Sequence, residues 1–263
     1  MIYLINYADS AFKNAQHYST KKAYSYGKVD KVIEYGPKDI EKNFHDENKE
    51  IFSIKRGAGL WLWKPYICLK TINEINDGDY LVYLDSGAVL INDIRNLIKL
   101  MKSDFYVSRL PLFEYNYTSK NVLEYFNDSG NSQQILATFF IFKKSKATIK
   151  FLNNWLELCR DIDLLQGNNK GEKLISHRED QSIFSLLVKK NNIESHTDPS
   201  QFGFFPSKYI LQSDFHSYVN EKYNENDKII IFCHRQKKIS FYLKIKTLIY
   251  KFYPRFLLFK ELC

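Results

Sequence analysis

Short apolar runs alternate along this chain with longer segments in which apolar residues recur at helical spacing. Runs of the first kind predict strands, and segments of the second kind predict helices. The predicted strands cover residues 2–7, 31–35, 80–84, 105–108, 139–142 and 228–233, with short strands around residues 195–197 and 209–212. The main predicted helices cover residues 11–26, 39–48, 65–76, 92–101, 118–126, 146–165 and a segment that opens at Ser176. Because strands and helices alternate, we expect an α/β fold with a mostly parallel central sheet flanked by helices.

The run at residues 80–84 is the best candidate for a central strand. It contains no charge, it follows a turn, and Asp85, Ser86 and Gly87 come directly after it. An apolar run of this kind is typical of a strand buried on both faces, and ligands of open α/β sheets bind beyond the carboxyl ends of such strands. Asp85 is therefore expected at the rim of a ligand crevice, with a polar turn that only leaves the core as the alternative.

The composition allows a sizeable core and suggests an anionic partner. Hydrophobic residues make up 44% of the 263 positions, and the formal net charge is +8. The four cysteines lie far apart without metal-ligand spacing, which is typical of reduced thiols in a cytoplasmic protein. No apolar stretch is long enough to be a signal peptide or to cross a bilayer.

Residues 55–66 form an unusual loop with two glycines, two tryptophans and three cations. Arg56 and Lys64 can pair with phosphate, and the faces of Trp61 and Trp63 can carry a sugar ring. The alternative is that both tryptophans fill the core and that the cations are solvated.

Two further segments carry candidate chemistry. Ser176 and Glu179 have the spacing of a capping box, which gives Glu179 a structural role and leaves Asp180 as the better chemical candidate. The alternative role for Asp180 is a favourable position near the helix dipole. His234 and Arg235 follow the last strand, where they can meet a metal or a diphosphate, although a lone histidine is usually structural.

Residues 237–263 contain seven Lys or Arg residues and one Glu, so they carry most of the net charge. They predict a basic amphipathic helix, kinked near Pro254, that lies in an anionic membrane interface. Packing of this helix on its own domain is the alternative. The polar row would hold Lys244, Thr247, Lys251 and Arg255, and the apolar row Ile245, Leu248, Ile249, Phe252 and Phe256.

These motifs resemble the bacterial GT-A-type glycosyltransferases of capsule and lipopolysaccharide synthesis. The matching segments are residues 56–66, residues 80–87, residues 177–181 and residues 232–235, so the resemblance covers roughly residues 1–236. It implies a GT-A fold, with Asp180 as the catalytic base of an inverting reaction or as an orienting residue of a retaining one. The nucleotide-sugar site that it implies contains Asn6, Tyr7, Arg56, Trp63, Lys64, Asp85, Ser86, Gly87, Gln134 and Arg235.

The resemblance also implies a divalent ion, Mn²⁺ or Mg²⁺, held on the diphosphate by Asp85 and His234. Gly87 departs from the family pattern, because it stands where the second carboxylate of an Asp-x-Asp motif is expected. Mg²⁺ keeps several of its waters and needs few protein ligands, so a site without that carboxylate is still chemically reasonable.

The sequence thus predicts a glycosyltransferase domain at residues 1–236 and a membrane-associating tail at residues 237–263. The expected donor is a UDP-hexose and the expected acceptor a lipid-linked or growing surface glycan. We expect a cytoplasmic protein that is peripheral on the inner face of the cell membrane and binds no nucleic acid. The alternatives are a noncatalytic membrane-interaction domain and a nucleic-acid-binding protein that uses the basic tail.

Overall fold

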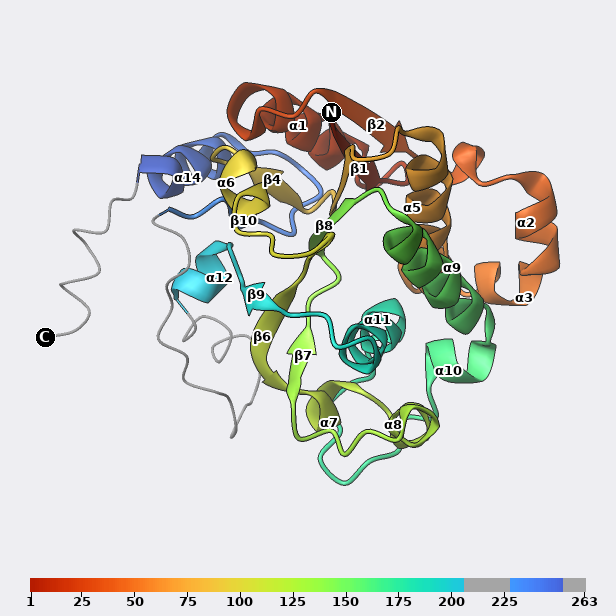
Figure 1. The fold of residues 1–263 in the computed structure, drawn as a ribbon. Helices are drawn as coiled ribbons and strands as arrows, with labels where there is room; N and C mark the ends of the chain where they lie inside the picture. The colour runs from red at the N-terminus through yellow and green to blue at the C-terminus, as the bar shows by residue number, and fades with distance from the viewer. Residues whose placement is uncertain (206–227, 253–263) are drawn as a thin grey trace, which may run out of the picture.

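The computed structural model describes residues 1–205 and 228–252 and is built on a five-stranded sheet (Figure 1). The strand order is β2-β1-β3-β8-β5. β1 pairs in parallel with both β2 and β3, whereas β8 runs antiparallel to its neighbours β3 and β5. Four strands therefore point the same way, which confirms the mostly parallel sheet. Their bounds are β1 Ile2–Tyr7, β2 Lys31–Tyr35, β3 Tyr80–Leu84, β5 Phe105–Tyr106 and β8 Phe139–Lys143.

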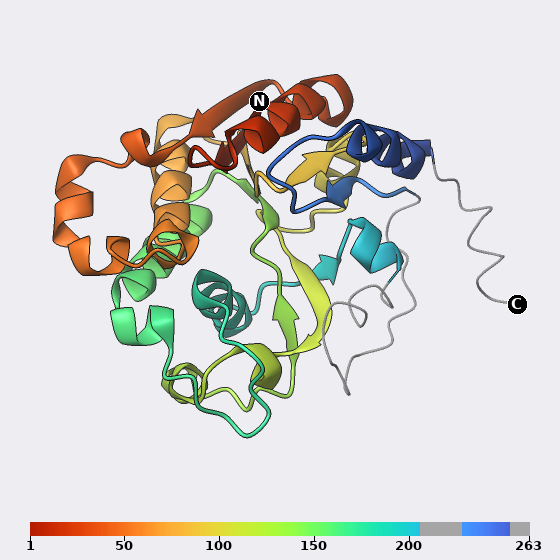
Figure 2. The same cartoon turned by 180° about the vertical axis from the view of Figure 1, so that it is seen from behind.

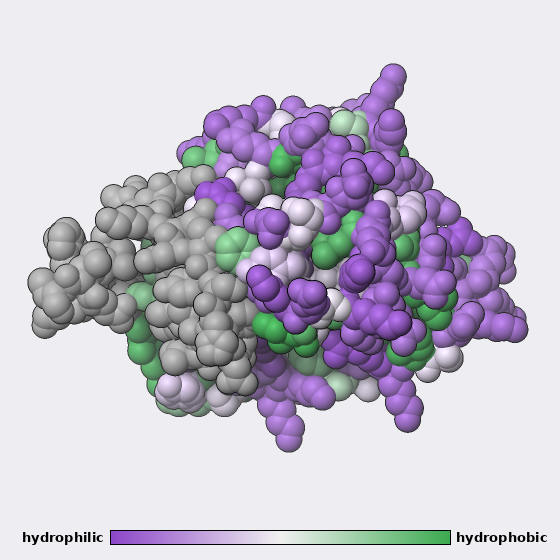
Figure 3. All heavy atoms as spheres, turned by 90° about the horizontal axis from the view of Figure 1, so that it is seen from below, coloured by the Kyte–Doolittle hydropathy of each residue, from purple (hydrophilic) through white to green (hydrophobic). Residues whose placement is uncertain are grey.

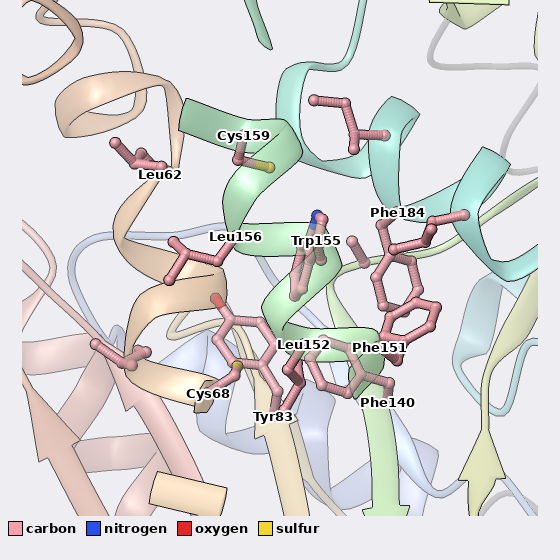
Figure 4. Packing of buried hydrophobic residues seen from close by; sticks show 14 of the residues in the cluster. Leu62, Cys68, Tyr83, Phe140, Phe151, Leu152, Trp155, Leu156, Cys159 and Phe184 are labelled. Atoms are coloured by element: carbon pink, nitrogen blue, oxygen red, sulfur yellow. The ribbon is translucent and has the colours of Figure 1, made fainter. Parts of the chain in front are cut away.

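β3 has the predicted central position, because it lies between β1 and β8, and residues 81–84 are fully buried. One face of the sheet packs on three helices, α5 (Trp63–Glu74), α9 (Lys146–Arg160) and α11 (Glu179–Lys190). Figure 4 shows how Trp155 of α9 and Phe184 of α11 pack on the strand residue Phe140. The Phe184 ring centroid lies 4.8 Å from that of Trp155 and 5.2 Å from that of Phe140. The apolar side of the predicted helix over residues 146–165 therefore belongs to the core.

The opposite face of the sheet is covered by shorter elements. A two-stranded antiparallel sheet of β4 and β10 lies beside α1 and α6, and Leu90, Ile94 and Ile230 belong to the core cluster that includes Leu4 and Val82 of the central strands. Figure 2 shows this layer from behind. The bounds are α1 Lys13–Lys22, a π-helical turn η1 Ala23–Gly27, β4 Ala88–Leu90, α6 Arg95–Ile98 and β10 Ile231–Cys233.

A third sheet, of order β7-β6-β9, lies below the central one in Figure 1. β4, β7 and most of β6 were not predicted. β4 and β7 have three residues each, which is too short for an alternating pattern to be visible, and β6 contains Pro111, which argues against a strand. The remaining elements are η2 Pro37–Asp39, α2 Lys42–Glu47, α3 Lys49–Phe52, α4 Gly57–Leu60, β6 Ser108–Phe113, α7 Glu114–Tyr117, α8 Lys120–Phe126, β7 Gln133–Ile135, α10 Ile162–Gln166, β9 His196–Thr197, α12 Gln201–Phe204 and α14 Phe241–Phe252.

Two predicted helices are divided in the structure. The one over residues 39–48 is broken at residues 40–41, because η2 ends at Asp39 and α2 begins at Lys42, and the one over residues 146–165 breaks at Asp161. Asp161 has extended backbone angles, and its Oδ1 accepts from the backbone N–H groups of Asp163 and Leu164, so it caps α10 as a new helix.

The C-terminal helix α14 packs on the domain by one edge. Leu243 belongs to a cluster with Val89 and Phe232, and Thr247, which was predicted on the polar row, is buried. The predicted strand over residues 209–212 and the predicted roles of Pro254, Arg255 and Phe256 lie outside the described residues. Within the described ranges, no helix is both long enough and apolar enough to cross a membrane. Figure 3 shows a face on which hydrophilic residues dominate and hydrophobic residues lie in separate groups.

Candidate active site

A cavity of about 690 Å³ opens at the carboxyl ends of the central strands. Asp85 follows β3 and lines this cavity, and Tyr7 lines it from the end of β1. Ser86 joins the two strand ends, because its hydroxyl donates to the Tyr7 carbonyl at 2.6 Å. Parallel strands bring their carboxyl ends to one edge of the sheet, so this position follows from the fold. Of the sequence-predicted site residues, the cavity is lined by Tyr7, Arg56, Trp63, Lys64, Asp85, Ser86, Gly87, Asp180 and Arg235.

The tryptophan loop forms one wall of the cavity in an unusual backbone conformation. All five residues from Gly57 to Trp61 have positive φ angles, between 51° and 93°. A Cβ atom on Gly57 would lie 2.3 Å from the Trp61 ring, so this glycine is required for the close approach. The Trp63 indole donates to the Gly57 carbonyl at 2.9 Å and stacks on Tyr7 with a centroid distance of 3.9 Å. Trp63 therefore belongs both to the core and to the cavity wall.

Lys64 is a buried cation between two carboxylates. Its Nζ lies 2.7 Å from Asp180 Oδ2 and 3.8 Å from Asp85 Oδ1, and only 4% of its side chain is exposed. Burial lowers the pKa of Lys64, but Asp180 and Asp85 outweigh this effect and hold it above its ordinary value. Lys64, which was predicted to contact the nucleotide-sugar, lines the cavity and pairs there with both carboxylates. Its contact with a nucleotide-sugar stays a prediction.

Asp180 is buried in the first turn of α11. Burial raises its pKa to about 7, although the Lys64 ammonium acts in the opposite direction. The indole of Trp155 donates to the Asp180 carbonyl at 3.1 Å, which fixes this part of the backbone to the core. A carboxyl with a pKa near neutrality is suited to accept a proton at physiological pH.

The predicted capping box at Ser176 and Glu179 is wrong. α11 begins without a side-chain cap, and the Ser176 hydroxyl donates instead to the His177 carbonyl at 3.2 Å. Glu179 pairs with Arg56, whose Nε lies 2.5 Å from Glu179 Oε1. A charge-assisted bond to a guanidinium is stronger than a bond to a backbone amide, and only tertiary structure brings Arg56 within reach.

Gly87 lines the cavity, and the backbone of residues 234–235 lies directly beside it. Its carbonyl accepts from the backbone N–H groups of His234 and Arg235, both at 2.8 Å. A Cβ atom on Gly87 would lie 3.3 Å from the Arg235 Cα, so a side chain there would require this backbone to shift by a few tenths of an ångström. Gly87 thus allows a close approach, as expected for a glycine. The group that approaches it in the structure is the backbone of residues 234–235.

The residues predicted to hold a divalent ion do not fit one. His234 does not line the cavity, and burial lowers its pKa to about 4. Its Nδ1 accepts from the Gln236 N–H at 3.0 Å, so the proton of the neutral ring is on Nε2, which then has no lone pair for a metal. Lys64 would repel a cation at Asp85. Among residues 1–205 and 228–252, no three His, Cys, Asp or Glu side chains are arranged to bind a metal.

Two predicted nucleotide-sugar residues lie behind the cavity wall. The Asn6 side-chain oxygen accepts from Gln16 Nε2 at 2.9 Å, and Gln134 Oε1 accepts from Arg178 at 3.2 Å and from Gln181 at 2.9 Å. Both side chains are fully buried, and neither lines the cavity. Their contacts are with neighbouring side chains, so contact with a nucleotide remains an expectation without support from this arrangement.

Several cavity residues had no assigned role in the sequence analysis. Arg178 stacks on Tyr117, with 3.6 Å between its guanidinium carbon and the ring centroid. Asp198 and Phe202 come from a stretch that resembles loops in sequence, and no motif marked it. Of these three residues, Arg178 had a signal, because it lies in the segment of residues 177–181.

No family model and no curated protein sequence matches this chain. Its fold does match solved structures. The galactosyltransferase LgtC, in a complex with donor and acceptor sugar analogs, overlaps with a TM-score of 0.50 at 14% identity, over 88% of this chain and 86% of LgtC. The chain has the GT-A glycosyltransferase fold.

Two further structures overlap less closely. Mouse xyloside xylosyltransferase 1 has a TM-score of 0.48 at 10% identity, over 91% of this chain and 100% of that one. The glycosyltransferase GlyE from Streptococcus pneumoniae TIGR4 has a TM-score of 0.48 at 13% identity, over 95% of this chain and 60% of GlyE.

Proposed function

We propose that this chain is a nucleotide-sugar-dependent glycosyltransferase that moves a hexose from a UDP-sugar to a lipid-linked or growing bacterial surface polysaccharide. The observation that carries the proposal is the placement of Asp85 and Asp180 in one cavity at the carboxyl ends of the central strands, with Lys64 between them. Ligands of open α/β sheets bind at this edge, and paired carboxylates there can position or activate hydroxyl groups.

Asp180 is the proposed base. In an inverting reaction, the acceptor oxygen bonds to the anomeric carbon, its proton passes to Asp180, and the bond from that carbon to the diphosphate breaks. The leaving diphosphate takes the bonding electrons. Lys55, Arg56 and Arg235 line the same cavity and can counter this charge. In a retaining reaction, Asp180 would orient the substrates instead.

A membrane partner is supported by the surface of α14. Its outer row exposes Ile245, Leu248, Ile249 and Phe252, with between 41% and 66% of each residue accessible. Lys244 and Lys251 lie on the same helix, so apolar and cationic groups are presented together, as binding to an anionic membrane interface requires. We therefore place the enzyme on the cytoplasmic face of the cell membrane. The boundary before Lys237 remains a prediction, and Leu243 packs across it.

The test of this function is release of UDP from UDP-sugars in the absence of an acceptor, measured for the full chain and for Asp85→Ala. Slow release is expected from the parent chain and should be lost in the variant. Asp77→Ala serves as the matched control, because the Asp77 side chain is 92% exposed and does not line the cavity. If the parent chain binds no nucleotide-sugar, the proposed function is wrong.

A further inference from the structure

Arg56 and Glu179 join the two walls of the cavity. Arg56 precedes the tryptophan loop, and Glu179 is the first residue of α11, 123 positions later. The guanidinium contacts the carboxylate through two nitrogens, with Nε 2.5 Å from Oε1 and Nη2 3.4 Å from Oε2. The Arg56 side chain is 58% exposed, whereas that of Glu179 is 10% exposed. The pair therefore connects a buried carboxylate to a cation that ligands can reach.

The backbone on both sides of this ion pair is strained. Glu179 has a φ of 38°, which is rare for a residue with a side chain, and the positive φ angles of residues 57–61 follow directly after Arg56. Such conformations persist when the surroundings hold them, and they concentrate at functional sites. The strain is thus located where the ion pair fixes the loop to the helix.

The guanidinium retains one unused edge. Its Nε and Nη2 contact Glu179, and within residues 1–205 and 228–252 the edge formed by Nη1 and the second N–H of Nη2 has no hydrogen-bond partner. Arg56 lines the cavity, so this edge is available to a ligand there. A planar guanidinium edge matches two phosphate oxygens, which a lysine ammonium cannot do in the same fixed geometry.

We propose that Glu179 is a positioning residue that holds Arg56 so that its Nη1–Nη2 edge receives the diphosphate of the nucleotide-sugar. This proposal rests on the proposed function. A ligand that pulled Arg56 away would leave the buried Glu179 carboxylate without its ion-pair partner, which is unfavourable. Glu179 therefore remains paired when the diphosphate binds, and Arg56 bridges the two anions.

The experiment measures the dissociation constants of UDP and of uridine by calorimetry for the full chain and for Glu179→Gln. We expect UDP to bind about tenfold more weakly to the variant, because an aligned charge-assisted contact is lost. Uridine should bind as before, because it has no phosphate. Glu172→Gln is the matched control, since Glu172 is exposed in the loop before α11. A variant that is only misfolded would lose uridine binding as well.

A double-variant cycle decides how Glu179 acts. If it acts through Arg56, the pair Glu179→Gln with Arg56→Gln will bind UDP no more weakly than Arg56→Gln alone. Arg56→Lys should keep the charge but restore little of the affinity. Additive effects, or tighter UDP binding to Glu179→Gln, would overturn the proposal. If UDP binds to the parent chain and binds equally well to Glu179→Gln, the proposal is also wrong, while the proposed function is unaffected.

Discussion

Lys64 Nζ lies 2.7 Å from Asp180 Oδ2, and at most 5% of either side chain is exposed. A buried ion pair of this kind does not itself guarantee stability, because desolvation offsets much of the attraction. Removing one partner leaves the other charge buried and unpaired. Replacing both charges together should therefore cost less stability than replacing either one alone.

Lys64→Met should lower the free energy of unfolding by about 3–5 kcal/mol, because it leaves Asp180 buried without its counter-ion. Replacing Asp180 by Leu in the same chain should recover much of this loss. Urea unfolding of the three proteins provides the measurement. Lys70→Met is the control, because Lys70 pairs with Glu41 near the surface, and it should cost about 1 kcal/mol or less. Equal losses in the single and double variants would show that the ion pair has no such role.

Asp180 should make stability fall with pH between the ordinary carboxyl pKa, about 4, and its folded value of about 7. In this window the folded chain holds a proton that the unfolded chain has released, so rising pH favours unfolding. Above pH 7 this contribution is constant. Urea midpoints at pH 5 and pH 8, compared between the parent chain and Asp180→Asn, isolate the effect. The same decline in both proteins would contradict it.

Transfer activity should rise with pH through the same range if Asp180 is the base, because only its ionised form accepts a proton. The acid limb of the rate profile is therefore expected near pH 7. The control is UDP binding, measured over the same pH range, which separates the effect on chemistry from an effect on the donor. An acid limb that lies near pH 4 would indicate that another carboxyl supplies the base.

UDP binding should change by no more than about twofold when EDTA replaces Mn²⁺, because the predicted ligand pair does not fit an ion. Gly87→Asp should not create a metal requirement. Its side chain would meet the Arg235 backbone, so we expect a loss of about 1–3 kcal/mol of stability instead. Calorimetric titration with and without metal tests both statements. Loss of UDP binding in EDTA would contradict this prediction and would support the metal site that the family resemblance implies.

Ile249→Glu and Phe252→Glu should weaken binding to anionic vesicles by at least about tenfold each, because each removes an exposed apolar group from the membrane-facing row. Vesicle flotation measures this. Tyr125→Glu is the control, since Tyr125 is 55% exposed on α8, away from the tail. Point variants are preferable to truncation before Lys237, because removing Leu243 would uncover Val89 and Phe232. Unchanged flotation would remove the membrane proposal and leave the enzymatic one.

The sequence by itself determined the central part of the fold. The uncharged run at residues 80–84 is buried between β1 and β8, and Asp85 lies at the cavity, as the pattern predicted. These features depend on local signals, namely side-chain polarity, period and turn residues, which act over a few positions. The amphipathic helices around the sheet follow from the same signals.

Tertiary structure alone decided the partners of the charged residues. Nothing local shows that Glu179 prefers Arg56 to Ser176, that Lys64 joins Asp85 to Asp180, or that the Arg235 backbone fills the space beside Gly87. Each of these contacts joins segments far apart in the chain. Their energies depend on distance and burial, which exist only after the sheet and its helices have packed.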